Sequence, residues 1–367
     1  MINLDHKMTE KIEVRLTLED GSVYYGRSFG APVPAAGEVV FNTAMTGYPE
    51  SLTDPSYHGQ ILCLTYPLVG NYGAPAKQEE NDLYRFYESS SIHISGLIVS
   101  DYSFEYSHWN ASESLDEWLK RNNVPGIYGI DTRALTKRIR EKGSMPGKLE
   151  PAGTETDFYD PNKSNLVARV STRSKKTYGS GKYRIILIDC GVKYNIIRNL
   201  LKRDTTIIRV PWDYDYHKEE YDGLFISNGP GDPKMCTETI NNLKRSFEKD
   251  IPVFGICLGN QLMALASGAD TYKLKYGHRS HNQPVIIPGT DKAYITSQNH
   301  GYAVDNNTLN EEWYPLFINI NDKTNEGMKH KSKPFFSTQF HPEASGGPTD
   351  TDYLFDVFIE NIREAGR

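Results

Sequence analysis

Two different hydrophobic patterns divide the chain into halves. In the first half, apolar and polar residues alternate over residues 12–18, and Asp20-Gly21 predicts a hairpin turn into a second strand near Val23. Apolar runs predict further buried strands at Val39–Phe41, Ile61–Tyr66 and Gly96–Val99. The first half is therefore expected to be a mixed β/α domain.

Helix signals also occur in the first half. Ser114 and Glu117 have the spacing of a capping box, and Asp131 precedes a helix expected over Thr132–Lys142. Between the predicted strands lies Asn42–Ser56, which is rich in turn-forming residues and predicts a long loop. A loop of that length is either ornamental or part of a site.

The residue composition of the chain changes near its middle. Residues 151–182 are rich in proline, glycine and polar residues, which predicts a connector with a strand at Leu166–Val170. We therefore expect an N-terminal domain over 1–150, a connector over 151–182 and a second domain over 183–367.

In the second half, apolar strand patterns alternate with helical ones, which predicts an α/β domain. Its sheet should be open, mainly parallel and flanked by helices. The predicted strands are 184–189, 206–210, 223–227, 252–256, 293–296, 316–319 and 334–340, and the predicted helices are 193–202, 237–247, 258–266 and 353–362.

One strand-to-helix junction carries a candidate nucleophile. In Ile251–Ala266 a short apolar run stops at Gly255-x-Cys257-x-Gly259 and continues as a helix. A cysteine at such a corner lies at a helix N-terminus, where the unpaired N–H groups favour the thiolate. A buried core cysteine beside a packing glycine is the plainer alternative.

Two other predicted strands end in unusual residues. The strand at 223–227 runs into Asn228-Gly-Pro-Gly-Asp-Pro, and the strand at 334–340 runs into His341-Pro-Glu343. Each could be an ordinary turn. However, the carboxyl ends of parallel strands share one edge, so all three motifs should meet there. A histidine oriented by a carboxylate is the base that a cysteine nucleophile needs.

Other histidines carry weaker signals. His278, His281 and His300 suggest a metal cluster, but no acidic or thiol ligand lies at a helpful spacing, so we expect no metal there and a structural role instead. Gln298-Asn299-His300-Gly301-Tyr302 follows another predicted strand and could line the same pocket.

Composition restricts the function classes. The 367 residues have a formal net charge of −6, which gives no reason to expect nucleic acid or an anionic membrane as partner. The four cysteines form no CxxC pair, as in proteins of a reducing compartment. No leader sequence or long apolar run is visible, so we expect a cytoplasmic protein.

The motifs GICLGNQ, SNGPGDP, SQNHG and QFHPE resemble the signature blocks of class I, triad-type glutamine amidotransferases. The first-half block GEVVFNTAMTGYPESLTDPSYHGQILCLTYPLVGNYG is similar to the N-terminal domain of the small, glutaminase subunit of carbamoyl phosphate synthetase. Some short stretches look closer to the fused, multifunctional pyrimidine-pathway version. The chain would be either a free-standing subunit or the first part of a fused enzyme.

The resemblance implies a mechanism and its residues. Cys257 would attack the side-chain amide of L-glutamine, His341 would transfer protons and Glu343 would orient His341. Ammonia would pass to a large, ATP-using synthetase subunit or fused synthetase domain. The chain has no GxxxxGK[ST] motif, so we expect no cofactor in it, and ATP and metal on the partner. By the same resemblance, glutamine would be held by Ser56, Gly229, Gly231, Leu258, Gln261, Asn299, Gly301 and Tyr302.

Ser56 comes from the first half, so this pocket is expected near the domain junction. The oxyanion hole would use the N–H of Leu258 and one from the Gly229–Gly231 loop. Two positions depart from the family pattern: Asn260 stands where His is usual, and Tyr302 stands where Phe is usual.

Three functions are compatible with these residues. The first is a glutaminase that feeds carbamoyl phosphate synthesis for the arginine or the pyrimidine pathway, and the retained triad favours it. The second is a weakly active regulatory or scaffolding subunit, toward which only Asn260 points. The third is a free-standing γ-glutamyl hydrolase, which would have no use for the first domain.

Overall fold

The computed structural model describes residues 12–366. The start of the chain, to which the expectation about a leader sequence applies, lies outside the described part. The described chain forms two compact units that do not follow chain order. The first contains the residues up to Asn42, Gly59–Ala76 and Ile94–Asp160; the second contains Thr43–His58, Lys77–His93 and the residues from Pro161 onward. Two segments of the first half, including the one that carries Ser56, therefore belong to the second unit.

The first unit is a closed barrel in the order β1-β13-β3-β4-β9-β12-β2. In β1 the buried residues Val14, Leu16 and Leu18 alternate with more exposed ones, which is the pattern of a strand with one face on a core. Short pairs β5–β10 and β6–β11 lie outside the barrel sheet. The strands are β1 (Glu13–Leu18), β2 (Val23–Gly30), β3 (Ala35–Asn42), β4 (Gln60–Leu64), β5 (Leu68–Val69), β6 (Ala74–Pro75), β9 (Gly96–Ile98), β10 (Asp101–Tyr102), β11 (Ala111–Glu113), β12 (Pro125–Tyr128) and β13 (Met145–Pro151).

Both predicted helices of this unit are present with their caps. In α2 (Leu115–Arg121) Ser114 and Glu117 form the complete capping box. In α3 (Thr132–Lys142) the Asp131 side chain accepts from the N–H of Ala134, and the helix ends at Gly143 with φ 104°. Local sequence signals were sufficient for these helices.

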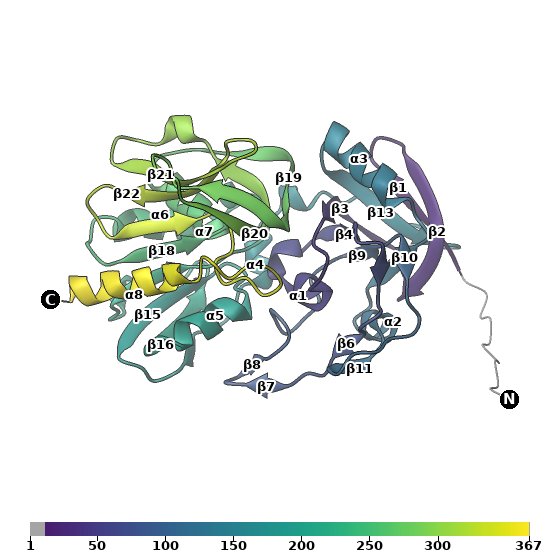
Figure 1. Cartoon of the computed structure of the whole chain (residues 1–367), viewed down its shortest axis with the longest axis horizontal. Coiled ribbons are helices and arrows are strands. Elements are labelled where there is room, and N and C mark those ends of the chain that lie inside the picture. The colour runs from purple at the N-terminus through teal and green to yellow at the C-terminus, as the bar shows by residue number, and fades with distance from the viewer. Residues whose placement is uncertain (1–11, 367) are drawn as a thin grey trace. The chain divides into compact units, whose positions relative to one another are not determined.

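The second unit contains one large sheet in the order β14-β16-β15-β17-β18-β23-β22-β21-β19-β20 (Figure 1). The pairs from β16 through β15, β17 and β18 to β23 are parallel, and the remaining pairs are antiparallel. The α/β class is confirmed, but the sheet is mixed rather than mainly parallel: four of the nine strand pairs that the described residues form in it are parallel, and they join the second to sixth strands of the order. These strands are β14 (Lys176–Tyr178), β15 (Tyr183–Asp189), β16 (Thr205–Pro211), β17 (Gly223–Ile226), β18 (Val253–Ile256), β19 (Thr271–Ile286), β20 (Ala293–Val304), β21 (Trp313–Asn319), β22 (Asn325–His330) and β23 (Phe335–Thr338).

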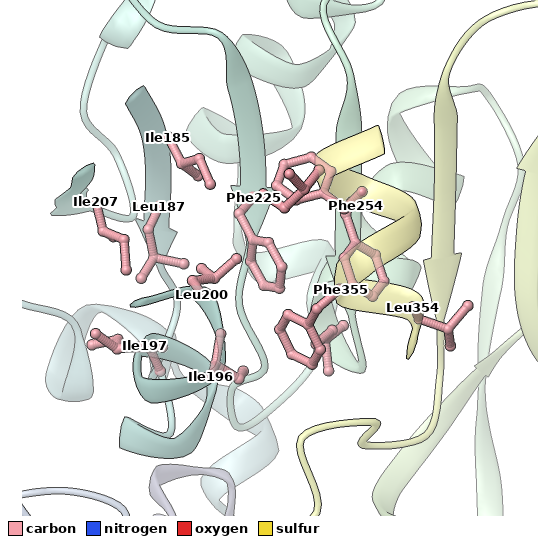
Figure 2. Packing of buried hydrophobic residues seen from close by; sticks show 14 of the residues in the cluster. Ile185, Leu187, Ile196, Ile197, Leu200, Ile207, Phe225, Phe254, Leu354 and Phe355 are labelled. Atoms are coloured by element: carbon pink, nitrogen blue, oxygen red, sulfur yellow. The ribbon is translucent and has the colours of Figure 1, made fainter. Parts of the chain in front are cut away.

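Helices complete the second unit, and a small hairpin, β7 (Glu79–Glu80) with β8 (Leu83–Tyr84), also belongs to it. Figure 2 shows Phe225 and Phe254 of the sheet beside Phe355 of α8. The Phe225 and Phe355 rings stack with centroids 6.0 Å apart, so α8 is anchored on the parallel part of the sheet. The helices are α1 (Tyr48–Thr53), α4 (Val167–Val170), α5 (Tyr194–Leu201), α6 (Thr237–Ser246), α7 (Leu258–Ala266) and α8 (Tyr353–Ala365), with short 3₁₀ turns η1 (Pro55–Tyr57), η2 (Pro161–Lys163), η3 (Tyr216–Lys218), η4 (Pro233–Met235) and η5 (Asn306–Thr308).

Two local predictions were wrong. The predicted strand at Leu166–Val170 is the helix α4, because the side chain of Asn165 accepts from the N–H of Ala168 and starts a helical turn. The predicted loop Asn42–Ser56 contains α1, whose first turn holds Pro49 and whose buried face includes Leu52. Such a short helix has too few residues to show a periodicity.

In the part of the chain that the structure describes, every helix is too short or too polar to cross a membrane.

Candidate active site

Cys257 lies at a strained corner between β18 and α7. Its φ is 56° and its ψ −101°, a backbone conformation that residues with a side chain rarely adopt. The corner leaves no space on either side: a Cβ on Gly255 would lie 2.8 Å from the Gly259 backbone, and one on Gly259 would lie 2.5 Å from the Ile226 carbonyl oxygen. The two glycines of the motif are therefore required for the turn to close.

His341 and Glu343 follow β23, the strand that pairs with β18. His341 Nδ1 lies 2.7 Å from Glu343 Oε1, and both side chains are buried. The other ring nitrogen, Nε2, has no hydrogen-bond partner among the described residues. Burial lowers the pKa of His341, but the charges of Glu343 and Cys257 outweigh it and raise this pKa to about 10. Cys257 is thus an electrostatic neighbour of the nitrogen that would take its proton.

A buried lysine supports this pair. Lys193 Nζ lies 3.0 Å from Glu343 Oε1 and donates to the carbonyl oxygen of Ala344 at 2.7 Å. Burial raises the pKa of Glu343, yet Lys193 and His341 outweigh it and lower this pKa to about 2. Burial likewise lowers the pKa of Lys193, and Glu343 with Glu88 raises it above the ordinary lysine value. Glu343, the group in contact with His341 Nδ1, is therefore held as a carboxylate.

Lys193 also links the site to a segment from the first half of the sequence. Glu88 is fully buried, lies 4.0 Å from Lys193 Nζ and 3.3 Å from Arg198 Nη1, and accepts from Ser345 Oγ at 2.7 Å. Ser345 has a φ of 71° and comes two residues after Glu343. Glu88 therefore joins α5 to the backbone after Glu343.

Cys257 has a side-chain neighbour whose role the sequence did not reveal. Gln339 Nε2 lies 3.6 Å from Cys257 Sγ, and Gln339 Oε1 accepts from Asn260 Nδ2 and Gln261 Nε2, each at 3.1 Å. Asn260 is fully buried and accepts from Ser337 Oγ at 2.7 Å. Asn260 thus acts on Cys257 through Gln339, with both ends of its amide satisfied.

Ser56 and Asn299, both predicted to bind glutamine, are joined by two other buried residues. Asn228 Nδ2 donates to Ser56 Oγ at 2.9 Å, and Asn299 Nδ2 donates to Asp54 Oδ2 at 3.0 Å. Asp54 also caps η1, because its Oδ1 accepts from the N–H of Ser56. All of these residues belong to the second compact unit. The reason for expecting the pocket near a domain junction, that Ser56 belongs to another domain, therefore does not hold.

The remaining predicted contacts lie around the start of α7 and the middle of β20. Gln261 Nε2 donates to the carbonyl oxygen of Tyr302 at 2.9 Å. The Tyr302 hydroxyl donates to Asn162 Oδ1 at 3.3 Å, which satisfies the group that the usual Phe lacks. A Cβ on Gly301 would lie 3.2 Å from Arg279 Nη2, so glycine leaves room at this position.

The loop after β17 is as tightly packed as the elbow. A Cβ on Gly229 would lie 2.1 Å from the Cys190 carbonyl oxygen and 2.8 Å from Leu258 Cδ2, and Gly231 has a φ of 86°. Leu258 is the first residue of α7, so its N–H has no acceptor within that helix. The sequence was sufficient to locate these backbone groups, because each of their motifs lies at the end of a predicted strand.

The structure changes the interpretation of the histidines. His281 lies apart, but His278 and His300 form a buried group with Glu326. The expectation that no acidic residue is within reach was wrong, because Glu326 comes from β22, which lies far along the chain. Lys193 and Glu88 were missed because each is a single polar residue without a local motif. Gln339 and Asp54 lie within the QFHPE block and the first-half block, but their spacing gave neither residue a role.

Comparisons with known proteins agree with this geometry. Residues 186–361 match the family model of class-I glutamine amidotransferases, and residues 16–149 match that of the carbamoyl-phosphate synthase small chain, CPSase domain. The arginine-specific small chain of carbamoyl phosphate synthase from Neosartorya fischeri is 49% identical over 376 residues, covering 99% of this chain and 83% of that protein.

Longer relatives are similar as well. The multifunctional protein CAD of Squalus acanthias is 54% identical over 356 residues, and the mitochondrial carbamoyl-phosphate synthase [ammonia] of Aquarana catesbeiana is 53% identical over 355 residues. Each match covers 95% of this chain, but the chain spans only 16% and 24% of those proteins. With its two matching domains and its small-chain relative, the chain belongs to the carbamoyl-phosphate synthase small-chain family and contains that family's class-I glutamine amidotransferase domain.

Proposed function

We propose that this chain hydrolyses L-glutamine to glutamate and ammonia through Cys257, His341 and Glu343, and delivers the ammonia to a synthetase that makes carbamoyl phosphate from bicarbonate and ATP. The observation that carries the proposal is the arrangement at one sheet edge. A strained cysteine elbow stands beside a buried His341–Glu343 pair, and Cys257 is one of the groups that raise the pKa of His341. ATP and its metal would be bound by the partner, which would be a large subunit or a fused synthetase domain.

The residues suggest the following steps. Cys257 Sγ attacks the amide carbon of the glutamine side chain, and its proton resides on His341 Nε2. The N–H of Leu258 and one from the Gly229–Gly231 loop stabilise the negative charge that develops on the amide oxygen. His341 then protonates the leaving nitrogen, which departs as ammonia and leaves a γ-glutamyl thioester. Water, deprotonated by His341, hydrolyses the thioester to glutamate and restores the thiol.

Substrate binding would use polar groups whose positions are already fixed. Asn299 and Ser56 are held by Asp54 and Asn228, and Gln261 is held by Tyr302 and Gln339. Groups held in this way lose little freedom when a ligand binds. Together with Gly229, Gly231, Leu258 and Gly301, they make up the proposed glutamine site.

The scaffolding alternative rests on Asn260, and the geometry does not strengthen it. Asn260 is fully buried and hydrogen-bonded at both ends, so it keeps Gln339 in place beside Cys257 without a titrating group. We therefore treat Asn260 as compatible with turnover.

The direct test is glutamate release from glutamine by the purified chain, with and without a carbamoyl phosphate synthetase large subunit, ATP and bicarbonate. Release that is slow alone and faster with the complete system supports the proposal. If a folded chain with reduced Cys257 releases no glutamate under either condition, the scaffolding function replaces it.

A further inference from the structure

The candidate lies in a buried polar group on the antiparallel side of the large sheet, apart from the triad. His278 on β19 and His300 on β20 are paired across the hairpin, with ring centroids 4.9 Å apart. Glu326 of β22 lies beside them, and all three side chains are almost completely buried. We propose that His278, His300 and Glu326, with the side-chain oxygen of Gln298, bind a divalent transition-metal ion such as Zn²⁺. This departs from the sequence expectation of a chain without metal.

Each histidine has one nitrogen fixed by an acceptor and the other directed at the group. His278 Nε2 lies 2.7 Å from Asp322 Oδ2, and His300 Nδ1 lies 2.8 Å from the carbonyl oxygen of Tyr302. In metal sites, a carboxylate or a backbone carbonyl commonly accepts the outer N–H of a ligating histidine and leaves the inner nitrogen free to bind. The two inner atoms are His278 Nδ1 and His300 Nε2.

The inner atoms have separations that suit one ion. Glu326 Oε1 lies 3.3 Å from His278 Nδ1 and 3.8 Å from His300 Nε2. Gln298 Oε1 lies 2.9 Å and 3.2 Å from the same two nitrogens. Ligand atoms of tetrahedral zinc with bonds of 2.0–2.1 Å are separated by about 3.3 Å, so a small inward adjustment would complete the site.

The hydrogen bonding of the group is incomplete without a positive centre. Glu326 Oε2 is buried and has no hydrogen-bond partner among the described residues. With His300 Nδ1 donating to Tyr302, His300 Nε2 carries a lone pair that faces the oxygens of Gln298 and Glu326. Gln298 Nε2 is already directed to Thr296 Oγ1 at 3.1 Å. A divalent cation beside Glu326 Oε1 would satisfy the lone pairs of His300 Nε2 and Gln298 Oε1 and balance the charges of Glu326 and Asp322.

The ion would have a structural role next to the proposed glutamine site. His300 stands between Asn299 and Gly301 in the chain, and the Tyr302 carbonyl that it contacts also accepts from Gln261. The metal would therefore fix the β19–β20 hairpin to β22 and hold these residues in place. This consequence rests on the proposed glutaminase function, whereas metal binding itself does not.

The competing state contains a proton in place of the metal. Burial lowers the pKa of His278, but hydrogen bonds and charges of Asp322 and Glu326 outweigh it and raise this pKa to about 9. A protonated His278 would donate to Asp322 on one side and to Gln298 on the other. Direct measurement of metal content separates the two states.

The experiment uses the full chain, purified without a histidine tag, loaded with Zn²⁺ and passed through a desalting column before elemental analysis. The expected content is about one equivalent of zinc in the parent protein. His278→Ala and Glu326→Gln should retain less than about a tenth of that, while His281→Ala, a change on the same strand outside the group, should retain all of it. Replacement by Co²⁺ should give the visible absorption of a tetrahedral site.

A second measurement does not depend on whether the variants fold. Removing zinc from the parent chain with EDTA should lower Tm by about 5 °C, and adding zinc should restore it. The proposal is overturned if the parent chain retains no zinc and EDTA leaves Tm unchanged, because the proton then occupies the group. Neither readout requires glutamine hydrolysis, so this proposal and the proposed function can fail separately.

Discussion

Two buried histidines in the second compact unit each have a carboxylate oxygen at the same distance from one ring nitrogen. His341 Nδ1 lies 2.7 Å from Glu343, and His278 Nε2 lies 2.7 Å from Asp322. They differ in what surrounds the second ring nitrogen. Among the described residues, His341 Nε2 has no hydrogen-bond partner, and Cys257 is one of the groups that raise the pKa of this histidine, whereas His278 Nδ1 faces the oxygens of Gln298 and Glu326. A carboxylate partner alone therefore does not identify a catalytic histidine.

The supports of the two carboxylates also differ. The Glu343 side chain is fully buried and pairs with the buried Lys193, whereas 44% of the Asp322 side chain is exposed. Solvent screens an exposed charge, so Asp322 orients its histidine more weakly than Glu343 does. The comparison predicts catalysis at one pair and a structural or metal-binding role at the other.

The largest loss of activity is expected when the thiol of Cys257, the neighbour of the His341–Glu343 pair, is removed. Cys257→Ser should reduce glutamate release by about 10³-fold or more, because the thioester route is lost. Cys63→Ala, which changes a buried cysteine of the first compact unit, is the matched control and should keep most of the activity. Normal release by Cys257→Ser would remove this residue from the mechanism.

Neutralising each carboxylate in turn tests the comparison directly. Glu343→Gln should lower kcat by about 100-fold or more, because His341 loses its orienting charge. Asp322→Asn should change kcat by less than about 3-fold and act mainly through KM. Steady-state kinetics of the two variants decide this point, and similar kcat losses in both would refute the distinction.

Lys193→Met should change how the free energy of unfolding depends on pH, because Lys193 lowers the pKa of Glu343 in the first pair. In the parent chain the pKa of Glu343 is about 2, so its stabilisation is complete above the ordinary pKa near 4.5 and is lost as the pH falls toward 2. Without Lys193 this pKa rises, so the rise of stability with pH between 2 and 4.5 becomes flatter. Removing the buried ammonium, while His341 remains beside Glu343, should also cost up to about 3–5 kcal/mol at pH 7.

Urea unfolding between pH 2 and pH 7 measures both effects of Lys193→Met. Lys333→Met provides a control, since Lys333 pairs with the exposed Asp250 at 3.5 Å and should contribute less than about 1 kcal/mol. An unchanged pH slope in Lys193→Met would show that Lys193 does not set the charge of Glu343.

The smallest effect is expected at the position that departs from the family. Asn260→His should change kcat by less than about 3-fold, because Asn260 contacts Cys257 only through Gln339. The larger ring must fit a fully buried site, so a stability loss of about 1–3 kcal/mol is expected. A large gain in glutamate release would instead show that Asn260 weakens the native site.

Several parts of this protein were decided by local sequence. The caps of α2 and α3 and the elbow at Cys257 depend on residues within a few positions of one another. The close sequence spacing of His341 and Glu343 likewise allowed their pairing to be expected. Short-range sterics and hydrogen bonds fix such features, so a single sequence reveals them.

Other parts depended on tertiary structure. The strands β19 and β22 were missed because they are rich in polar residues and, in β19, interrupted by bulges, so no apolar alternation marks them. Lys193, Glu88 and Glu326 acquire their roles only when distant strands and helices bring a charge or a histidine to them. A buried charge needs a partner, and the partner can come from any part of the chain, so only the folded structure determines which residue it is.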